Sequence, residues 1–547
     1  MRDVTWIGLA ALVLTAFAGG QSPVLTGHYD TARSGANLSE TVLTPETINY
    51  QSFGRIAALP VQGCVIAQPL YMPHVDFGDL GTHNVVFIAT SENFVYGFDA
   101  DSLKLLVQRN LGNPVSSGEI SQDTGYYDFP NCDGVDDIGP IGITGTPVID
   151  PTEGAMFLVS AQVDAPDPPH RHMAILYKVA LNTLADLNPP VEIIGSFSNP
   201  DETDTFDARY ELQRAALLEV NGNIYIAFSS HNDETPYHGW LFAYDSQLRQ
   251  RAIYDYSPGR SGMGIWQSGA GPAYDGSFVY VATGNSVDGV QSAGDFGDSI
   301  LKVDPDTLQV VAKTSFPNES NDWDYDSDLD LGSSRVISIP GTPFAVSGSK
   351  YGDMFVVNRY DMSLISRFQA TARHSSGFDW TGIYNGFAYW NQTLYVWPGG
   401  GQADGDPADP YQTDNLKAFS LTDKGASAMI AIGQTDGVGL GYQGAGLSIS
   451  ANGSDPNSGI VWALTPDGDS RWLRPGYLRA YAASASGVFT ELWHDGGDYN
   501  WAKFSQPLIA NGRVYTPTFS GEVMVYGLLN SSARQANGIN SSRPRPR

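Results

Sequence analysis

A short unit recurs along the whole chain, and this repeat constrains the fold more than any other feature. Each unit has a lead-in rich in Gly, Asn or Pro, followed by a run of β-forming residues. The eight units begin at AQPLYM (67–72), GTPVID (145–150), AALLEV (215–220), GPAYDG (271–276), RVISIP (335–340), FAYWNQ (387–392), LSISAN (447–452) and QPLIAN (506–511). Most are followed by a second hairpin with an acidic turn, such as FDADSLK (98–104) or VDPDTLQ (303–309). Each unit therefore predicts a four-stranded antiparallel sheet.

A four-stranded sheet cannot bury both of its faces alone, so repeated sheets are expected to pack radially as the blades of a β-propeller. We predict an all-β chain in which residues 21–529 form one eight-bladed propeller. The early strand FGRIAALPV (53–61) has no lead-in, and the final strand is GEVMVYGLL (521–529). These two strands are expected to share the last blade and close the ring. The polar tail (530–547) is expected to be disordered.

The N-terminal segment has the features of a secretory signal peptide. Arg2 precedes an apolar run from Trp6 to Phe17 and the small-residue pattern Ala16-Phe17-Ala18. A membrane anchor is the alternative, but the run is short and no later stretch approaches the roughly 20 apolar residues of a span. We expect residues 1–20 to be removed and the protein to be secreted, without stable membrane insertion and as a monomer. The formal net charge of −29 argues against nucleic acid as a partner, because binding it requires clustered Lys and Arg.

Two further features are consistent with export. The chain has only two cysteines, Cys64 and Cys132, which in an oxidising compartment favour one disulfide over a metal site; two separate buried thiols are the alternative. Six Asn-x-Ser/Thr sequons could carry glycans in a secreted eukaryotic protein. They are Asn37, Asn318, Asn391, Asn452, Asn530 and Asn540.

The turns FDADSLK and VDPDTLQ, the stretch ATGN (282–285) followed by DSILKVDPDTL (298–308), and the closing AKFSQPLIANGRVYTPTFSGEVMVYGL (502–528) together resemble a known superfamily. It is the eight-bladed propellers related to quinoprotein alcohol dehydrogenases, which use pyrroloquinoline quinone (PQQ), and the chain looks like a secreted branch of it. The resemblance covers nearly all of the mature chain. It implies oxidation of an alcohol or sugar, with PQQ beside a Ca²⁺ ion that polarises the quinone and an aspartate as base.

The resemblance also implies particular site residues. Asn285 of ATGN and Glu234 correspond to metal ligands, and Asp324 of NDWDYD (321–326) to a ligand and the catalytic base. Oxygen donors of this kind suit Ca²⁺. Trp266 is the indole nearest the position of the tryptophan that covers one face of PQQ.

Two departures support a second reading. The dehydrogenases cover the other face of PQQ with a disulfide between adjacent cysteines, which the distant Cys64 and Cys132 cannot form, and no Cys-x-x-Cys-His haem site is present. At the stretch that supplies the tryptophan, SGAGPAYDG (268–276), this chain has small residues. The alternative is a propeller without cofactor that binds or cleaves carbohydrate, or serves as an interaction scaffold.

The run DWDYDSDLD (322–330) has aspartate at every second position. An EF-hand loop is excluded, because counting from Asp322 its required Gly and Glu positions are Ser327 and Ser333. Apart from Asp324, the aspartates of this run are expected to form turn hydrogen bonds or to be solvated.

The remaining clusters are less specific. His231, Asp233, Glu234 and His238 could bind a transition metal or support acid–base chemistry, or simply form a hydrogen-bonded loop. His170 and His172 are expected to be structural, since no third ligand lies nearby in the sequence. The acidic insertion 123–137 could line a sugar or cation site but is expected to be a loop held by a disulfide. The Gly- and Asp-rich stretch 398–414 is expected to be a flexible loop.

Overall fold

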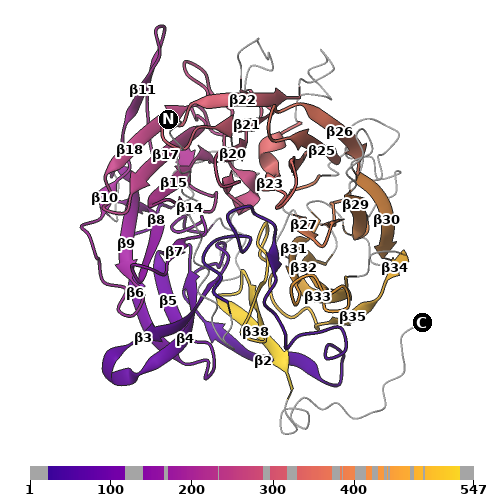
Figure 1. The fold of residues 1–547 in the computed structure, drawn as a ribbon. Helices are drawn as coiled ribbons and strands as arrows, with labels where there is room; N and C mark the ends of the chain where they lie inside the picture. Colours follow the sequence, from indigo (N-terminus) through magenta and orange to yellow (C-terminus); the bar gives the residue numbers. More distant parts are fainter. Residues whose placement is uncertain are drawn as a thin grey trace, which may run out of the picture.

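Eight antiparallel sheets are arranged radially around a common centre, which confirms the predicted eight-bladed propeller (Figure 1). The structure, a computed structural model, describes residues 22–116, 139–165, 170–231, 233–286, 296–316, 329–371, 382–384, 386–400, 414–421, 429–435, 440, 444–467, 474–483 and 487–529. The expected signal peptide and C-terminal tail lie outside these residues and stay predictions. The described residues contain no helix with the length and apolar character needed to span a membrane.

Most strands of a blade are close together in the sequence, and the first of them in chain order is nearest the centre. Blade 1 contains β3 (Leu70–Asp76), β4 (Thr82–Ala89), β5 (Phe94–Asp99) and β6 (Leu105–Asn110); blade 2 contains β7 (Val148–Asp150), β8 (Ala155–Val163), β9 (His172–Ala180) and β10 (Val191–Glu192). Blade 3 contains β14 (Leu218–Val220), β15 (Asn223–Ala227), β17 (Trp240–Asp245) and β18 (Gln250–Asp255); blade 4 contains β19 (Ala273–Tyr274), β20 (Val279–Ala282), β21 (Ser299–Val303) and β22 (Val310–Ser315).

The second half of the ring repeats this order. Blade 5 contains β23 (Ile337–Ser338), β24 (Phe344–Gly348), β25 (Asp353–Asn358) and β26 (Leu364–Gln369); blade 6 contains β27 (Phe387–Trp390), β28 (Thr393–Val396), β29 (Lys417–Leu421) and β30 (Met429–Thr435), with β34 (Gly487–Phe489) added in parallel. Blade 7 contains β31 (Gly446–Ser450), β32 (Ile460–Pro466), β33 (Gly476–Ala482) and β35 (Glu491–His494), with β1 (Ala36–Asn37) added in parallel; blade 8 contains β36 (Leu508–Ala510), β37 (Arg513–Pro517), β38 (Glu522–Leu528) and β2 (Phe53–Pro60).

Strand burial follows the position of the strand in its blade. In blade 5 every residue of β24 is buried, and so are the first five of β25, because these strands have a neighbouring blade against each face. The outermost strand β26 instead alternates between exposed and partly buried residues. The hydrophobic core therefore lies between the blades, as a series of clusters rather than one mass.

The last blade combines strands from the two ends of the sequence. β2 pairs with β38 in antiparallel register, from Phe53 opposite Leu528 to Pro60 opposite Glu522. Leu529 N–H then donates to Ser52 O at 2.7 Å.

The segment 24–37 crosses the centre of the ring and contacts all eight blades (Figure 1, indigo). Its hydrogen-bond partners in blades 1 to 8, in order, are Tyr71, Ile149, Leu217, Tyr274, Ser338, Tyr389, Ile449 and Ile509. Innermost strands have an unpaired edge, and a buried backbone N–H needs an acceptor. We call residues 24–37 the hub segment, since it supplies acceptors to seven blades and a donor, the Thr26 hydroxyl, to Leu217 O of blade 3.

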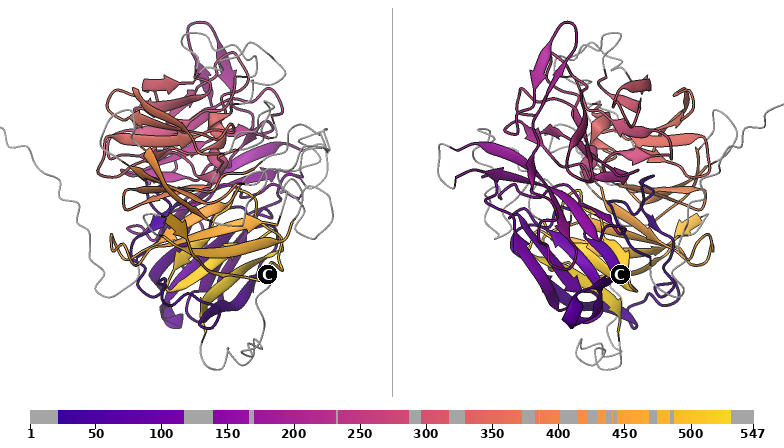
Figure 2. Two further views of the ribbon diagram at one scale, coloured as in Figure 1. Left: turned by 90° about the vertical axis from the view of Figure 1, so that its right-hand side faces the viewer. Right: turned by 60° about the vertical axis from the view of Figure 1, so that its left-hand side comes forward.

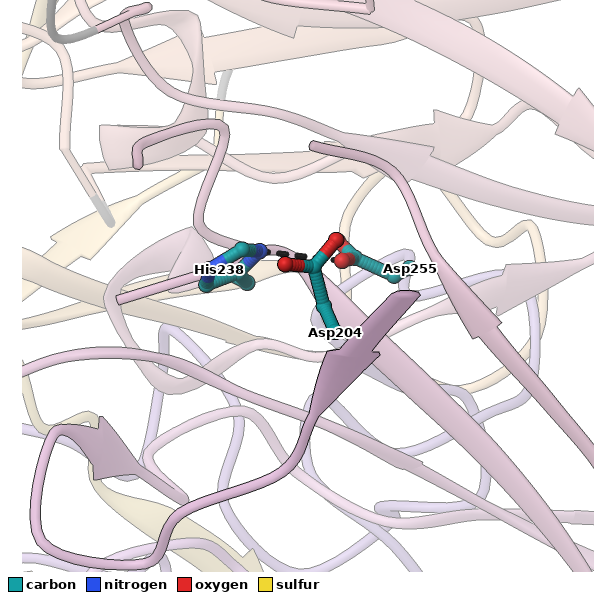
Figure 3. Close-up of side chains that lie close together, drawn as sticks. All are labelled: Asp204, His238 and Asp255. Atoms are coloured by element: carbon teal, nitrogen blue, oxygen red, sulfur yellow. Dashed lines mark hydrogen bonds and ion pairs between the residues drawn. The ribbon is translucent and has the colours of Figure 1, made fainter. Parts of the chain in front are cut away.

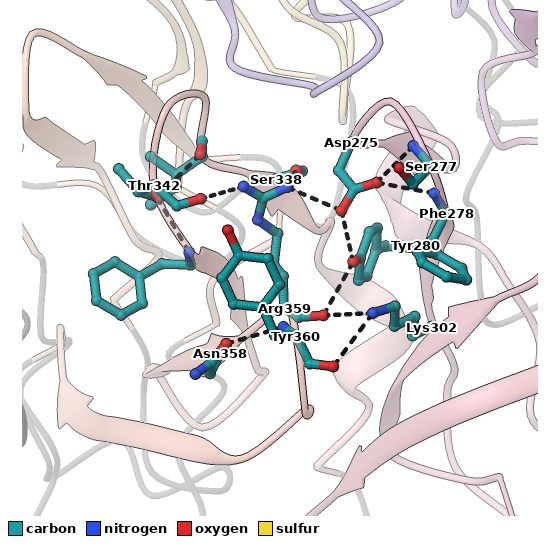
Figure 4. Close-up of polar contacts among 12 residues, drawn as sticks. Asp275, Ser277, Phe278, Tyr280, Lys302, Ser338, Thr342, Asn358, Arg359 and Tyr360 are labelled. Carbon is teal, nitrogen blue, oxygen red and sulfur yellow. Dashed lines mark hydrogen bonds and ion pairs between the residues drawn. The ribbon is translucent and has the colours of Figure 1, made fainter. Parts of the chain in front are cut away.

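A polar network joins blades 4 and 5 (Figure 4). Asp275 accepts hydrogen bonds from the backbone N–H groups of Ser277 and Phe278 and from the Tyr280 hydroxyl, and it pairs with Arg359 Nη1 at 3.0 Å. Lys302 Nζ donates to Arg359 O at 2.8 Å. Both members of the Asp275–Arg359 pair are largely shielded from solvent, so the pair is screened less than a surface pair.

The Asp275→Asn variant is expected to lower the free energy of unfolding at pH 7 by about 1–3 kcal/mol, because it removes charge-assisted hydrogen bonds. Burial raises the pKa of Asp275, but its hydrogen bonds and the charge of Arg359 outweigh burial and hold this pKa below the ordinary value of 3.8. A carboxyl with a lower pKa in the folded state stabilises the fold above its unfolded pKa, and that stability is lost as the pH falls through the folded pKa.

Urea unfolding at neutral pH and at pH values below about 4 checks both statements. The wild type should lose more stability on acidification than Asp275→Asn does. Asp306→Asn, a neutralised exposed aspartate in the same blade, is the control and should behave as the wild type. Equal acid sensitivity of the wild type and Asp275→Asn would contradict the prediction.

Candidate functional site

Three aromatic side chains meet on the propeller axis. Trp266 lies in the lead-in of blade 4, Tyr384 in that of blade 6 and Phe504 in that of blade 8. The Trp266 and Phe504 ring centroids are 4.6 Å apart in an edge-to-face arrangement. Blades 4 and 8 are opposite in an eight-membered ring, so this contact marks the axis. Trp266, predicted to bind a cofactor, is thus axial and partly exposed.

A buried arginine supports this aromatic group. Arg214 Nη2 donates to Phe504 O at 2.9 Å, and Nη1 donates to Thr144 O at 3.3 Å. Gly269 has a φ of +87°, and a Cβ there would lie 1.9 Å from Arg214 Nη1. A side chain at position 269 would therefore displace the guanidinium from its contacts with Thr144 O and Phe504 O.

Asn285 lies where three loops run side by side. Gly262 bridges to His238 of the blade 3 loop and to Ser286 of blade 4. Met263 N–H donates to Asn285 O at 2.7 Å. Since Met263 precedes Trp266 by three residues, this bond ties the Asn285 backbone to the segment that carries Trp266. The topology thus joins two stretches that were candidates in the sequence, the loop 231–238 and ATGN.

Asp330 is the aspartate of the run 322–330 that the structure brings to Asn285. Its N–H donates to Asn285 Oδ1 at 2.8 Å, and its carboxylate pairs with Lys350 Nζ at 2.9 Å. The sequence predicted only turn hydrogen bonds or solvation for this residue. Asp324, the predicted base and ligand, lies outside the described residues.

Two glycines make this close approach possible. A Cβ on Gly284 would lie 2.8 Å from Asp330 Oδ1, and a Cβ on Gly332 would lie 2.4 Å from Gly284 N. The short 3-10 helix η4 (Leu331–Ser333) contacts η3 (Gln267–Gly269) directly after Trp266. Asp330 is therefore positioned by backbone packing between blades 4 and 5.

Tyr237 is buried, and the charges of Asp330 and Lys350 act on its hydroxyl. Burial, and then the negative charges of Asp233 and Asp330, raise the pKa of Tyr237 well above its ordinary value, while Lys350 opposes the shift. Its phenol therefore stays protonated and can donate a hydrogen bond.

Glu234, the predicted carboxylate ligand, lies in the same loop and is partly exposed. Its N–H donates to His231 O at 3.1 Å. Asp233 accepts a hydrogen bond from Ser230 Oγ at 3.0 Å, as expected for a hydrogen-bonded loop.

The two histidines of this loop lie in different surroundings. His231 is buried, and burial followed by the charge of His172 lowers the pKa of His231 to about 3, so it is neutral near pH 7. The sequence placed no third histidine near His170 and His172, whereas the fold brings His231 within electrostatic range of His172. His238 Nδ1 instead pairs with Asp255 Oδ2 at 2.9 Å.

Only some of the residues predicted to form a disulfide or carry a glycan are among the described residues. Cys64 is buried, and its expected partner Cys132 lies outside the described residues, as do the sequons at Asn318, Asn530 and Asn540. Asn391 and Asn452 are exposed. Asn37 is 8% exposed and its Nδ2 donates to Ile509 O at 2.9 Å, so a glycan on Asn37 would have to displace a contact within the fold.

Several solved structures share this fold. A quinohemoprotein alcohol dehydrogenase from Pseudomonas putida HK5 has a TM-score of 0.61 at 13% identity, over 96% of this chain and 82% of that chain. One from Comamonas testosteroni has a TM-score of 0.59 at 13% identity, over 93% of this chain and 81% of that chain. A europium-containing methanol dehydrogenase has a TM-score of 0.58 at 14% identity, over 94% of this chain and 99% of that chain. The chain therefore has the eight-bladed fold of quinoprotein dehydrogenases.

Sequence comparison adds nothing to this structural likeness. No protein-family model matches the chain. No curated protein matches it. Function must therefore be argued from the side chains themselves.

The side chains near the axis fit a quinone and a cation by type. Asn285 and Asp330 offer amide and carboxylate oxygens, the donors that Ca²⁺ prefers, and Glu234 lies in the adjoining loop. Arg214 places positive charge beside the aromatic group, and Lys350 places it beside Asp330. Trp266 offers a partly exposed indole braced by two aromatic rings.

Proposed function

We propose that this protein is a quinoprotein-like oxidoreductase that oxidises an alcohol or sugar hydroxyl. The observation that carries the proposal is the arrangement of Asp330, which bonds to Asn285 and pairs with Lys350 close to Trp266. A carboxylate held in this way can accept the hydroxyl proton of a substrate, as general bases do.

The chain's own residues would divide the remaining work. Lys350 orients the Asp330 carboxylate and balances its charge. Tyr237, held protonated, can donate a hydrogen bond to a substrate oxygen. Glu234, Asn285 and Asp324 would hold Ca²⁺, and Trp266 would pack against PQQ. When bound, PQQ with Ca²⁺ supplies the acceptor for the two electrons of the substrate.

A propeller without cofactor that binds or cleaves carbohydrate, or acts as a scaffold, is the second candidate. A braced, partly exposed indole is also a stacking surface for a sugar ring, and the adjacent-cysteine lid is absent from the sequence. In either case we propose that the protein is exported and acts as a monomer.

Reconstitution of the purified protein with PQQ and Ca²⁺ tests the two candidates against each other. We expect quinone absorbance to remain with the protein after desalting, and dye reduction with at least some members of an alcohol and sugar panel. Loss of both signals, together with quenching of tryptophan fluorescence by an oligosaccharide, would support the carbohydrate-binding candidate instead.

A further inference from the structure

Three side chains lie close together where blade 3 meets a neighbouring hairpin (Figure 3). Asp204 lies in β12 (Thr203–Thr205), His238 precedes β17, and Asp255 ends β18. One nitrogen of His238 and one oxygen of each carboxylate all lie within 4.8 Å of one another.

In both carboxylates, one oxygen accepts hydrogen bonds from residues outside the cluster, and these bonds orient the carboxylate. Asp255 Oδ1 accepts hydrogen bonds from Ser257 N–H at 2.8 Å and Ser257 Oγ at 3.1 Å, while Oδ2 faces His238. Asp204 Oδ2 accepts from Gly259 N–H at 2.7 Å, which leaves Oδ1 available. Outer hydrogen bonds of this kind are typical of metal ligands, because they fix the direction of the ligating atom.

Among the described residues, only His238 forms an ion pair with a carboxylate of the cluster. Asp255 is fully buried, and within the described residues no Lys or Arg forms an ion pair with Asp204, Asp255 or the neighbouring Glu211. Two carboxylates and one imidazole thus share a poorly solvated site. A divalent cation would neutralise both carboxylates.

Glu211 provides an independent indication of a missing partner. Its Oε1 accepts hydrogen bonds from His238 N–H at 2.9 Å and Trp240 Nε1 at 3.2 Å, whereas its buried Oε2 has no hydrogen-bond partner among the described residues. A buried carboxyl with an unused oxygen beside the cluster is expected to bind water or a ligand of the cluster.

We infer that Asp204, His238 and Asp255 form a binding site for a divalent transition-metal ion. One imidazole nitrogen with two carboxylate oxygens suits Zn²⁺ or Mn²⁺ better than Ca²⁺, which takes oxygen donors. Three protein ligands leave coordination positions for water or an oxygen-containing ligand. The site uses none of the residues assigned to the proposed oxidoreductase function, although His238 follows Tyr237 in the chain, and the inference does not depend on that function.

The position of the site also predicts an effect of metal binding on stability. Asp204 belongs to the hairpin of β11 (Ser196–Ser198) and β12, which projects beyond the blades of the ring (Figure 2). His238 and Asp255 belong to blade 3 itself. A metal ion bound by all three would tie this hairpin to the blade, so metal binding should raise the thermal stability of the protein.

The test uses the full chain, stripped with chelator and titrated with Zn²⁺ or Mn²⁺ in the presence of excess Ca²⁺. Calorimetry and the shift in melting temperature report binding, and Co²⁺ absorbance reports the coordination geometry. We expect one ion to bind per chain through these residues. Asp204→Asn should weaken binding at least tenfold, while its circular dichroism matches that of the wild type.

Asp201→Asn is the matched control, since it removes the same charge from the turn of the same hairpin. It should bind the metal as the wild type does. The inference is overturned if the wild type binds neither metal, which would make the cluster an ion pair of His238 with two carboxylates. Equal affinity of Asp204→Asn and Asp201→Asn would overturn it as well.

Discussion

The Asp330→Asn variant is expected to lower kcat/KM of the reconstituted enzyme by about 10²–10⁴-fold, the usual contribution of a general base. Asparagine preserves the size of the side chain and the N–H that bonds to Asn285, but it cannot accept a proton or pair with Lys350. Dye reduction at saturating PQQ and Ca²⁺, with the substrate varied from below to above KM, measures the effect. Quinone absorbance after desalting measures cofactor binding separately.

The control is Asp361→Asn, which neutralises an exposed aspartate of blade 5 away from Asn285 and should leave the rate unchanged. If Asp330→Asn still binds the cofactor but no longer reduces the dye, Asp330 is identified as the base. An Asp330→Asn variant with unchanged rate would contradict the role of Asp330 and return the base to another residue, Asp324 being the next candidate.

The Arg33→Ala variant is expected to lower the free energy of unfolding by about 3–5 kcal/mol, as removal of a buried, fully bonded charge does. Arg33 is fully buried in the hub segment. Its guanidinium donates to Pro272 O at 2.8 Å, Thr26 Oγ1 at 2.8 Å, Gly27 O at 2.7 Å and Leu217 O at 3.1 Å. Alanine would remove a donor from each of these buried acceptors, of which Leu217 O would retain only the Thr26 hydroxyl.

Urea unfolding followed by tryptophan fluorescence and circular dichroism measures this loss. Arg55→Ala is the control, because Arg55 pairs with Asp498 at an exposed position of blade 8 and such pairs contribute about 0–1 kcal/mol. If Arg33→Ala is no more destabilising than Arg55→Ala, the hub segment does not contribute to stability through Arg33.

The propeller could be predicted because its signals are local. Turn residues and β-forming runs recur in order, and most strands of a blade are close together in the chain, so a segment such as GPAYDG and the strands after it specify their own sheet. The hub segment was not predicted. Its bonds join residues up to 480 positions apart, as from Ile509 N–H to the Tyr29 hydroxyl, and no short pattern encodes such a distance.

The candidate site was predicted in part for the same reason. Asn285, Glu234 and Trp266 stood out by resemblance, because they lie in recognisable stretches. Lys350 and Asp330 carry no such motif, and they meet only because Gly284 and Gly332 let two blades approach. Asp204 could not be linked to His238 either, since a separate hairpin brings it to the blade.

The sequence by itself determined the number and kind of the blades, because β-strand pairing between neighbours depends on local alternation and turns. Only the tertiary structure decided which charges face one another. The closure of a ring brings together residues that are far apart in the chain, and the free energy of those contacts depends on burial and distance, which a linear pattern does not contain.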